Sequence, residues 1–184
     1  MIHTSRLLLR QWREEDREPW AAMGADPEVM EFFPTPLSRE QADASFDRFS
    51  TALIERGWGL WAVDLDGRFI GFTGLAPATF DAHFTPAIEI GWRFARSAWG
   101  QGYATEAAQA VLAFGFTELG LDEIVSFTST TNVRSRAVME RIGMTRNAAD
   151  DFDNPNVPEG NPLRPHVLYR LTRECSDMAV LAAD

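Results

Sequence analysis

Residues 89–107, with the sequence EIGWRFARSAWGQGYATEA, decide the fold. The segment reads as a strand, then a tight glycine turn, then the first turn of a long helix. That order gathers unpaired backbone N–H groups and the positive end of a helix dipole around one point, which favours an anion. Glu89 lies on the strand that leads into the turn. We therefore expect a phosphorylated cofactor at the turn and a carboxylate on the adjoining strand.

Outside this segment, hydrophobic periodicity predicts further helices and strands. Ser38 and Gln41 form a capping-box pattern, Asp16 is a candidate helix cap, and Asp66 with Gly67 is a strong signal for a β-hairpin. We expect the strands before the turn to pair antiparallel, and the strand after the long helix to run parallel to the strand of Glu89. The expected elements are strands at 5–10, 60–65, 68–75, 123–130 and 166–171, and helices at 16–25, 38–56, 104–119 and 132–142.

The chain of 184 residues fits one domain, which we expect to span residues 1–172, with a C-terminal tail at 173–184. Its net charge of -10 and pI near 4.8 argue against nucleic acid and anionic membranes as partners, whereas an acidic surface tolerates a cationic amine. The single cysteine, Cys175, cannot form an intramolecular disulfide, and no segment reads as a signal peptide or a membrane span. We therefore expect a cytoplasmic protein, either a monomer or a homodimer.

The glycine turn has three interpretations. In the first, the glycines only allow the helix to pack closely on the sheet. The second is a dinucleotide-binding turn, G-x-G-x-x-G, which requires glycine where Thr105 stands. Its ribose-binding acid belongs at the end of the next strand, whereas Glu123 lies at the start. The third is a site for acyl-coenzyme A, and it depends on a family resemblance.

Several motifs resemble those of the GNAT N-acetyltransferase superfamily. They are EIGW at 89–92, WGQGYATEA at 99–107, NVRS at 132–135 and MERIGM at 139–144. The opening segments, TSRLLLRQW at 4–12 and DPEVM at 26–30, are similar to the RimJ/RimL-like branch of ribosomal-protein and small-amine acetyltransferases. The match extends over residues 4–171. It implies an α+β fold in which a mixed, mostly antiparallel sheet of about six to seven strands is flanked by helices and splayed at the strand of Glu89.

The resemblance also implies acetyl-CoA as co-substrate and no metal, and the three histidines are too scattered to suggest a metal site. The pantetheine arm is expected to pair with backbone near Trp92 and Phe94, and the backbone N–H groups of the turn are expected to hold the pyrophosphate. Arg96 lies one residue from a position where the family often has Gln or Arg, and Asn132 is either a pantetheine ligand or a helix N-cap. The expected cofactor-binding residues are Trp92, Phe94, Arg96, Gly100, Gln101, Gly102, Tyr103, Ala104, Asn132 and Ser135.

Glu89 and Ser135 are the catalytic candidates. An amine must lose a proton before it attacks a thioester, and a departing thiolate, whose thiol has a pKa of about 8.5, gains from a proton donor. Glu89 is the candidate base, acting directly or through water; the alternative is a solvated or ion-paired strand carboxylate. Many relatives carry a tyrosine where this chain has Met139, so Ser135 is the candidate acid. The alternative for Ser135 is a serine bonded to its own helix backbone.

The sequence defines the acceptor site less well. Phe33, Glu89 and Asn154 are expected to line it, together with Phe32, the His83 loop at 77–86 and the loop at 150–161. The whole loop at 147–165 is expected to be functional. The acidic residues of that loop could hold a cationic amine, although a solvated acidic loop is the favoured interpretation. The expected reaction is direct attack on acetyl-CoA by a primary amine, from a small molecule or a peptide or protein N-terminus. The alternative is a catalytically idle acyl-CoA-binding sensor or interaction module with the same fold.

Overall fold

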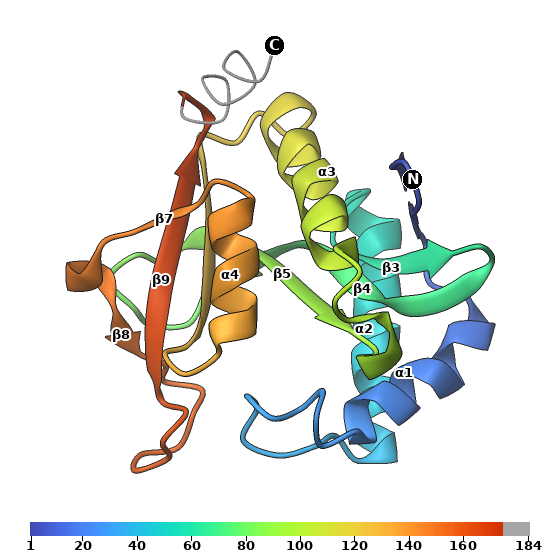
Figure 1. Ribbon diagram of the computed structural model, residues 1–184, viewed down its shortest axis with the longest axis horizontal. Coiled ribbons are helices and arrows are strands. Elements are labelled where there is room, and N and C mark those ends of the chain that lie inside the picture. The colour runs from blue at the N-terminus through green and yellow to red at the C-terminus, as the bar shows by residue number, and fades with distance from the viewer. Residues whose placement is uncertain (175–184) are drawn as a thin grey trace. The chain divides into compact units, whose positions relative to one another are not determined.

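The computed structural model describes residues 1–174, which form two compact units (Figure 1). The first unit contains residues 1–76 and 91–111, and the second contains residues 77–90 and the described part of 112–184. Cys175 lies outside the described residues, as does most of the expected tail. The expected boundary of a single domain at residue 172 stays a prediction.

An antiparallel meander and the helices α1 and α2 build most of the first unit. Its elements are β1 (Ile2–His3), β2 (Leu8–Arg10), the 3-10 helix η1 (Glu14–Asp16), α1 (Arg17–Ala25), α2 (Arg39–Arg56), β3 (Leu60–Leu65) and β4 (Arg68–Ala78), whose last residues enter the second unit. The four strands pair in sequence order, as expected. The capping box of Ser38 and Gln41 is confirmed at the start of α2. The β3–β4 hairpin turns at Asp66 and Gly67, whose φ angles of 51° and 81° are the left-handed values that this turn requires.

Aromatic side chains fill the core of the first unit. The rings of Trp12, Trp20, Phe46, Phe49 and Phe72 have centroids 5.4–6.5 Å apart, and several pairs meet edge to face. Trp20 is only 1% exposed, and its indole N–H donates to the backbone of α2 at 2.9 Å. Large rings bury more apolar area than other side chains, so this cluster supplies much of the unit's hydrophobic stabilisation.

A buried ion network ties β2 to η1 and β3. Arg10 donates from Nη1 to Asp16 at 2.6 Å and from Nε to Asp64 at 2.9 Å. The hydrogen bond to Asp16 is the main reason that the pKa of Arg10 is raised, although burial opposes the effect. The expectation that the Asp16 side chain caps α1 is wrong, because that carboxylate is bonded to Arg10 and to the Arg13 N–H.

The second unit centres on β6 and β9. Its elements are β6 (Glu123–Ser129), α4 (Val133–Arg141), β7 (Thr145–Arg146), η3 (Ala148–Asp150), β8 (Phe152–Asp153) and β9 (Pro165–Thr172). It shares β5 (Ala87–Phe94) and α3 (Tyr103–Thr117) with the first unit, to which the 3-10 helix η2 (Arg96–Ala98) belongs. The predicted parallel pairing of β5 with β6 is confirmed, with Glu89 opposite Val125. The strand β9 pairs antiparallel with β6, β7 and β8, and α4 packs against β6 (Figure 1).

The predicted fold class is confirmed: the chain is a mixed, mostly antiparallel α+β protein with helices flanking its strands. Residues 1–174 contain nine strands and not six to seven, because β1, β7 and β8 have two residues each, which is too short for a hydrophobic period. The expected splay at the strand of Glu89 stays a prediction. No helix in this part of the chain is long and apolar enough to cross a membrane.

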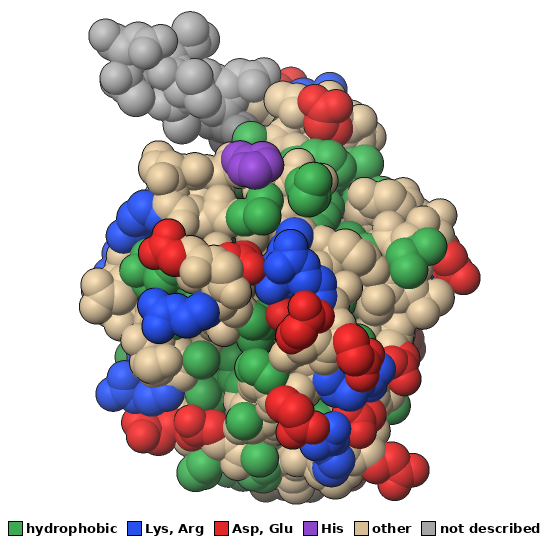
Figure 2. Space-filling view, turned by 90° about the vertical axis from the view of Figure 1, so that its right-hand side faces the viewer, with side chains coloured by type: hydrophobic (Ala, Val, Ile, Leu, Met, Phe, Trp, Pro, Cys, Tyr) green, Lys and Arg blue, Asp and Glu red, His purple; other side chains and the backbone are tan. Residues whose placement is uncertain are grey.

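Charged side chains of both signs are mixed on the surface. On the face drawn in Figure 2, acidic and basic groups lie side by side, and the basic ones do not gather in one patch. Many of these charges are paired, as Arg39 is with Glu18 at 2.7 Å and with Asp43 at 2.8 Å. Exposed pairs of this kind add little stability, so the buried network of Arg10 is the more sensitive target for mutation.

Arg10→Gln is expected to lower the free energy of unfolding by about 3–5 kcal/mol, because it leaves two buried carboxylates without their cation. Urea unfolding at pH 7, followed by circular dichroism, measures the loss. The matched control is Arg48→Gln, which removes an exposed arginine and is expected to stay within about 0.5 kcal/mol of the parent. Equal stability of Arg10→Gln and the parent would show that the network contributes nothing.

Candidate active site

The glycine turn between η2 and α3 presents exposed backbone in the first unit. Gly100 and Gly102 have φ angles of 75° and 81°, left-handed values at which a larger side chain is strained. The backbone hydrogen bond from the Glu106 N–H to the Gly102 carbonyl, at 3.0 Å, opens the helical ladder. The N–H groups just before Glu106 therefore have no partner in that ladder, as at any helix start. This backbone suits an anion such as a pyrophosphate.

An N-terminal strap holds this turn in place. The guanidinium of Arg6 donates to the Gln101 carbonyl at 3.0 Å and to the Glu106 carboxylate at 2.7 Å, and it lies 4.7 Å from the centre of the Tyr103 ring. Thr4 donates to the other Glu106 oxygen at 2.6 Å. Partial burial alone would raise the pKa of Glu106, but the hydrogen bonds from Thr4 and Arg6 outweigh it and lower that pKa. Sequence reasoning missed this strap, since nothing in the spacing links residue 6 to residue 101.

The other expected cofactor residues of the first unit lie on β5 and just after it. Trp92 is partly exposed, whereas Phe94 is 5% exposed and its carbonyl accepts a bond from the Trp99 indole at 2.9 Å. Arg96 is exposed, with its Nε bonded to Glu28 at 2.8 Å. Their roles in cofactor binding stay predictions.

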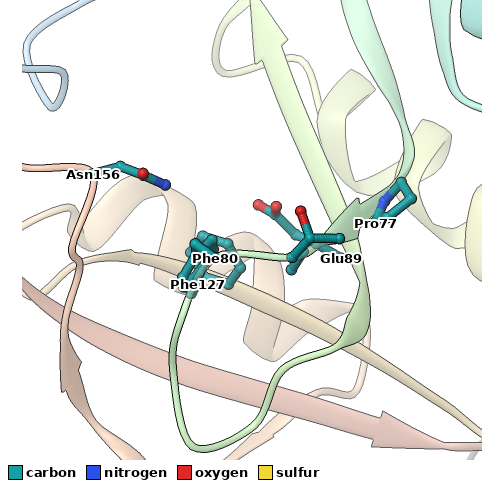
Figure 3. Close-up of a pocket in the computed structure, with 7 residues that line it drawn as sticks. Pro77, Phe80, Glu89, Phe127 and Asn156 are labelled. Carbon is teal, nitrogen blue, oxygen red and sulfur yellow. The ribbon is translucent and has the colours of Figure 1, made fainter.

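A pocket of about 430 Å³ lies within the second unit, a volume that suits a small ligand. It is lined by Pro77, Ala78, Thr79, Phe80, Glu89, Phe127 and Asn156. Figure 3 shows the Phe80 and Phe127 rings side by side and the Glu89 carboxylate directed into the space above them, toward Asn156. The pocket thus combines an apolar aromatic wall with one carboxyl group.

Glu89 is held in poorly hydrated surroundings. Its side chain is only partly exposed, and it has neither a hydrogen bond nor an ion pair within residues 1–174. Burial disfavours the charged form and raises the pKa of Glu89 from 4.5 to about 8. The alternative reading of Glu89, as an ion-paired strand carboxylate, has no support in the described part of the chain.

The start of α4 carries Asn132 and Ser135, both in the second unit. The side-chain oxygen of Asn132 accepts from the Ser135 N–H at 3.2 Å and its amide donates to Thr128 at 2.9 Å, so Asn132 acts as the helix N-cap. The Ser135 hydroxyl is partly exposed and makes no hydrogen bond among the described residues. Met139, where relatives have a tyrosine, is 1% exposed. A catalytic role for Ser135 and a pantetheine contact for Asn132 stay predictions.

The loop at 147–165 is held by internal contacts. Asn154, expected at the acceptor site, is 8% exposed and bonds His166 at 3.2 Å and the Asn156 N–H at 2.9 Å, whereas Asn156 lines the pocket. His166 donates from Nδ1 to a backbone carbonyl at 3.0 Å, and burial lowers its pKa. Three of the loop's four acidic side chains are paired with arginines; the pairs are Asp150–Arg170, Asp151–Arg146 and Asp153–Arg164. These pairs engage the three aspartates of the loop, and Glu89 is the carboxylate that lines the pocket, so Glu89 is the stronger candidate to meet an amine.

The pocket wall includes residues of the loop at 77–86 and of the loop at 150–161, both expected to line the acceptor site, but sequence reasoning missed Phe127. Phe80 and Phe127 belong to an aromatic cluster with Phe84 and Phe152, with centroids 4.9–6.0 Å apart. Their only signal in the sequence is aromatic composition in a loop and in a strand, which does not show that they meet. Phe33, the remaining expected substrate residue, lies in the first unit and is 41% exposed.

Residues 6–145 match the family model described as an acetyltransferase (GNAT) domain. The chain belongs to the GNAT acetyltransferase family. FsC-acetyl coenzyme A-N(2)-transacetylase from Aspergillus fumigatus is 34% identical to this GNAT chain over 186 aligned positions, which cover 94% of the chain and 76% of that relative. The match confirms the resemblance, and the general reaction of the chain is acetyl-CoA-dependent N-acetylation.

Solved structures show the same fold. An acetyltransferase of the GNAT family from Bacillus anthracis is 29% identical, with a TM-score of 0.77 and coverage of 94% of this chain and 98% of that one. Mycobacterium smegmatis RimJ, in complex with CoA-disulfide, is 22% identical, with a TM-score of 0.74 and coverage of 96% and 89%. At 22% identity, the similarity to RimJ shows a common fold and nothing further.

The stability of the protein is expected to fall as pH rises from 5 to 9, by up to about 5 kcal/mol from Glu89. The raised pKa means that the folded state keeps a proton that the unfolded state has lost between pH 4.5 and about 8. Glu89→Gln has no carboxyl group to titrate at this position, so this pH-dependent destabilisation is absent. The free energy of unfolding of the variant, relative to that of the parent, should therefore increase with pH. Urea unfolding at several pH values measures the difference.

The control for this series is Glu55→Gln, which removes an exposed carboxylate on α2. Its stability should follow the parent at every pH. Parallel curves for Glu89→Gln and the parent would contradict the raised pKa.

Proposed function

We propose that this GNAT acetyltransferase transfers the acetyl group of acetyl-CoA to a primary amine in the pocket of the second unit, with Glu89 as base. The supporting observation is a carboxyl group that lines the pocket without a cation beside it in residues 1–174. An alkylammonium has a pKa of about 10.4, so its proton moves to a base with a pKa of about 8 at a cost of about 3 kcal/mol, against about 8 kcal/mol for an ordinary glutamate. The apolar surroundings of Glu89 therefore make it a more effective base.

The turn at Gly100 and Gly102 is the proposed pyrophosphate site. Its exposed backbone and left-handed glycines support this assignment, and the Arg6 strap fixes the loop before any ligand arrives. The neighbouring Gln101, Tyr103 and Ala104 would contribute backbone, with Trp92 and Phe94 pairing with the pantetheine arm. Acetyl-CoA supplies the thioester and the leaving thiolate.

Ser135 is the proposed donor to that thiolate. Its hydroxyl has no partner among the described residues, and Met139 cannot donate a proton. Asn132 orders the first turn of α4 and so fixes the position of Ser135. The serine ends with its own proton restored, because the proton that it gives to the thiolate is replaced by the one that the attacking amine nitrogen loses as the tetrahedral intermediate breaks down.

The acceptor is a primary amine of a small molecule or of a peptide N-terminus. Fold relatives are named for both: an aminoglycoside acetyltransferase AAC(6')-Ib, and RimL, a ribosomal L7/L12 alpha-N-protein acetyltransferase. The likeness to RimL and RimJ supports the RimJ/RimL-like branch. Phe33 and Asn154 as acceptor residues, the cytoplasmic location and a monomeric or homodimeric state stay predictions.

Incubation with acetyl-CoA and a panel of small amines and N-terminal peptides should release free thiol, measured with a thiol reagent. Turnover should rise as pH passes through about 8, when Glu89 loses its proton. Glu89→Gln should lower kcat by roughly 10²–10⁴-fold and remove that rise, as loss of a general base does. Glu55→Gln is the control and should keep the parent's profile.

Two results would contradict this account. An unchanged pH–rate profile in Glu89→Gln would exclude Glu89 as base. No turnover on any amine, together with tight binding of acetyl-CoA in calorimetry, would favour the idle acyl-CoA-binding module.

Gly102→Val should raise the KM for acetyl-CoA by at least about tenfold, because a side chain at a φ of 81° distorts the turn that holds the pyrophosphate. Steady-state kinetics with varied acetyl-CoA measures the change. Gly57→Val introduces the same left-handed strain at the end of α2 and serves as the control, with an unchanged KM expected. Equal KM values in both variants would place the pyrophosphate elsewhere.

A further inference from the structure

We propose that the pocket of the second unit selects monoamines with an apolar, preferably aromatic, body, and that Phe80 and Phe127 determine this preference. The class of amine follows from the lining of the pocket, and it rests on the proposed function, in which Glu89 meets the acceptor. All the residues that carry it belong to the second unit.

The lining of the pocket contains one ionisable group. Of the seven residues that form it, Glu89 has the only ionisable side chain, and Thr79 and Asn156 are the other polar ones. The apolar lining residues are Pro77, Ala78, Phe80 and Phe127. One amino group therefore finds a carboxyl group in the lining, whereas a second cation on the same molecule finds none. The lining indicates an acceptor with a single amino group.

The two phenylalanines determine which body that amine carries. Phe80 and Phe127 are both partly exposed, and their ring centroids lie 5.5 Å apart with the planes at 87°. Figure 3 shows the Glu89 carboxylate beside these rings, so an amine that contacts Glu89 has its carbon body against them. An apolar body removes both surfaces from water. An aromatic body also meets the rings in the edge and offset geometries that aromatic pairs prefer.

The aromatic wall is fixed by contacts within the second unit. Phe152 lies behind both rings, with centroids 6.0 Å from Phe80 and 5.7 Å from Phe127. The strands of Phe127 and Phe152, β6 and β8, both pair with β9. The Thr85 hydroxyl holds the loop of Phe80, since it donates to the Phe80 carbonyl at 2.6 Å. A wall ordered in this way loses little freedom when a ligand binds, so more of the apolar contact is retained as affinity.

The same lining is unfavourable for polyamines and for amines rich in hydroxyl groups. Their additional ammonium and hydroxyl groups would lose water against the rings of Phe80 and Phe127 without gaining hydrogen-bond partners there. We therefore expect diamines and amino alcohols to be poor acceptors.

The test compares acceptors that share an amino group and differ in the body attached to it. The probes are 2-phenylethylamine with ethanolamine, n-hexylamine with 1,6-diaminohexane, and the n-alkylamines from propyl to hexyl. The parent should favour 2-phenylethylamine over ethanolamine by roughly ten- to hundredfold in kcat/KM, as burial of a large apolar group does. Its kcat/KM should rise about threefold with each methylene of the alkylamines, and n-hexylamine should exceed 1,6-diaminohexane.

Variants of Phe80 test the origin of the preference. Phe80→Ser removes one of the two rings and should reduce the preference for 2-phenylethylamine by at least about fivefold, mainly through its KM. Phe80→Leu keeps an apolar side chain and should retain most of it. The control is Phe114→Ser, which removes a partly exposed phenylalanine of α3 outside the pocket lining and should retain all of it. Thermal unfolding shows which variants are folded, and the parent's own preference requires no variant.

The outcomes separate this proposal from the proposed function. Acetylation of 2-phenylethylamine and ethanolamine with equal kcat/KM would overturn the apolar selection and leave Glu89 as the base. An unchanged preference in folded Phe80→Ser would overturn the assignment to the ring. If no amine is acetylated, calorimetric titration of the protein with the same two amines still tests the pocket. Tighter binding of 2-phenylethylamine, weakened in Phe80→Ser, supports the proposal, and equal binding overturns it.

Discussion

The desolvation of Glu89 is the constraint on which the active site depends. A carboxyl group with no cation beside it, on a strand that forms one side of an aromatic pocket, keeps its proton to about pH 8. The cost to the folded state, up to about 5 kcal/mol at high pH, is a large part of the stability of a typical domain. The aromatic core of the first unit offsets such a destabilisation by burying apolar area.

Buried charged side chains are of two kinds in this chain: those that have a partner of opposite charge and those that have none among the described residues. Arg10 is buried with two carboxylates, and its role is to join strands and a helix. Glu89 is enclosed by apolar groups without a partner in residues 1–174, and such a group is typical of a site that meets a ligand. The glycine turn differs from both, since its proposed anion site consists of backbone N–H groups and not of charged side chains. Such a site does not require the side chain of Arg96, which is exposed and paired with Glu28.

Local pattern and family motifs made much of this structure predictable. The capping box at Ser38, the hairpin at Asp66 and the glycine turn each depend on residues that are close together in the sequence. Each is found where the sequence predicts it. The bond of Asp16 to Arg10, the strap from Arg6 to Gln101 and the packing of Phe80 against Phe127 join residues whose contact is set by tertiary packing. A single sequence does not show such contacts, so it does not place Phe127 in the pocket wall, nor does it show that Arg10 keeps the Asp16 side chain from capping α1.

The most direct test is the titration of Glu89 itself. Carbon-13 NMR of protein labelled at the glutamate side-chain carboxyl, with the Glu89 signal assigned by its absence in Glu89→Gln, follows protonation without any acceptor or cofactor. The account predicts a midpoint near pH 8 for that signal. A midpoint near 4.5 would show that Glu89 is an ordinary solvated carboxylate and would contradict its role as a base tuned by burial.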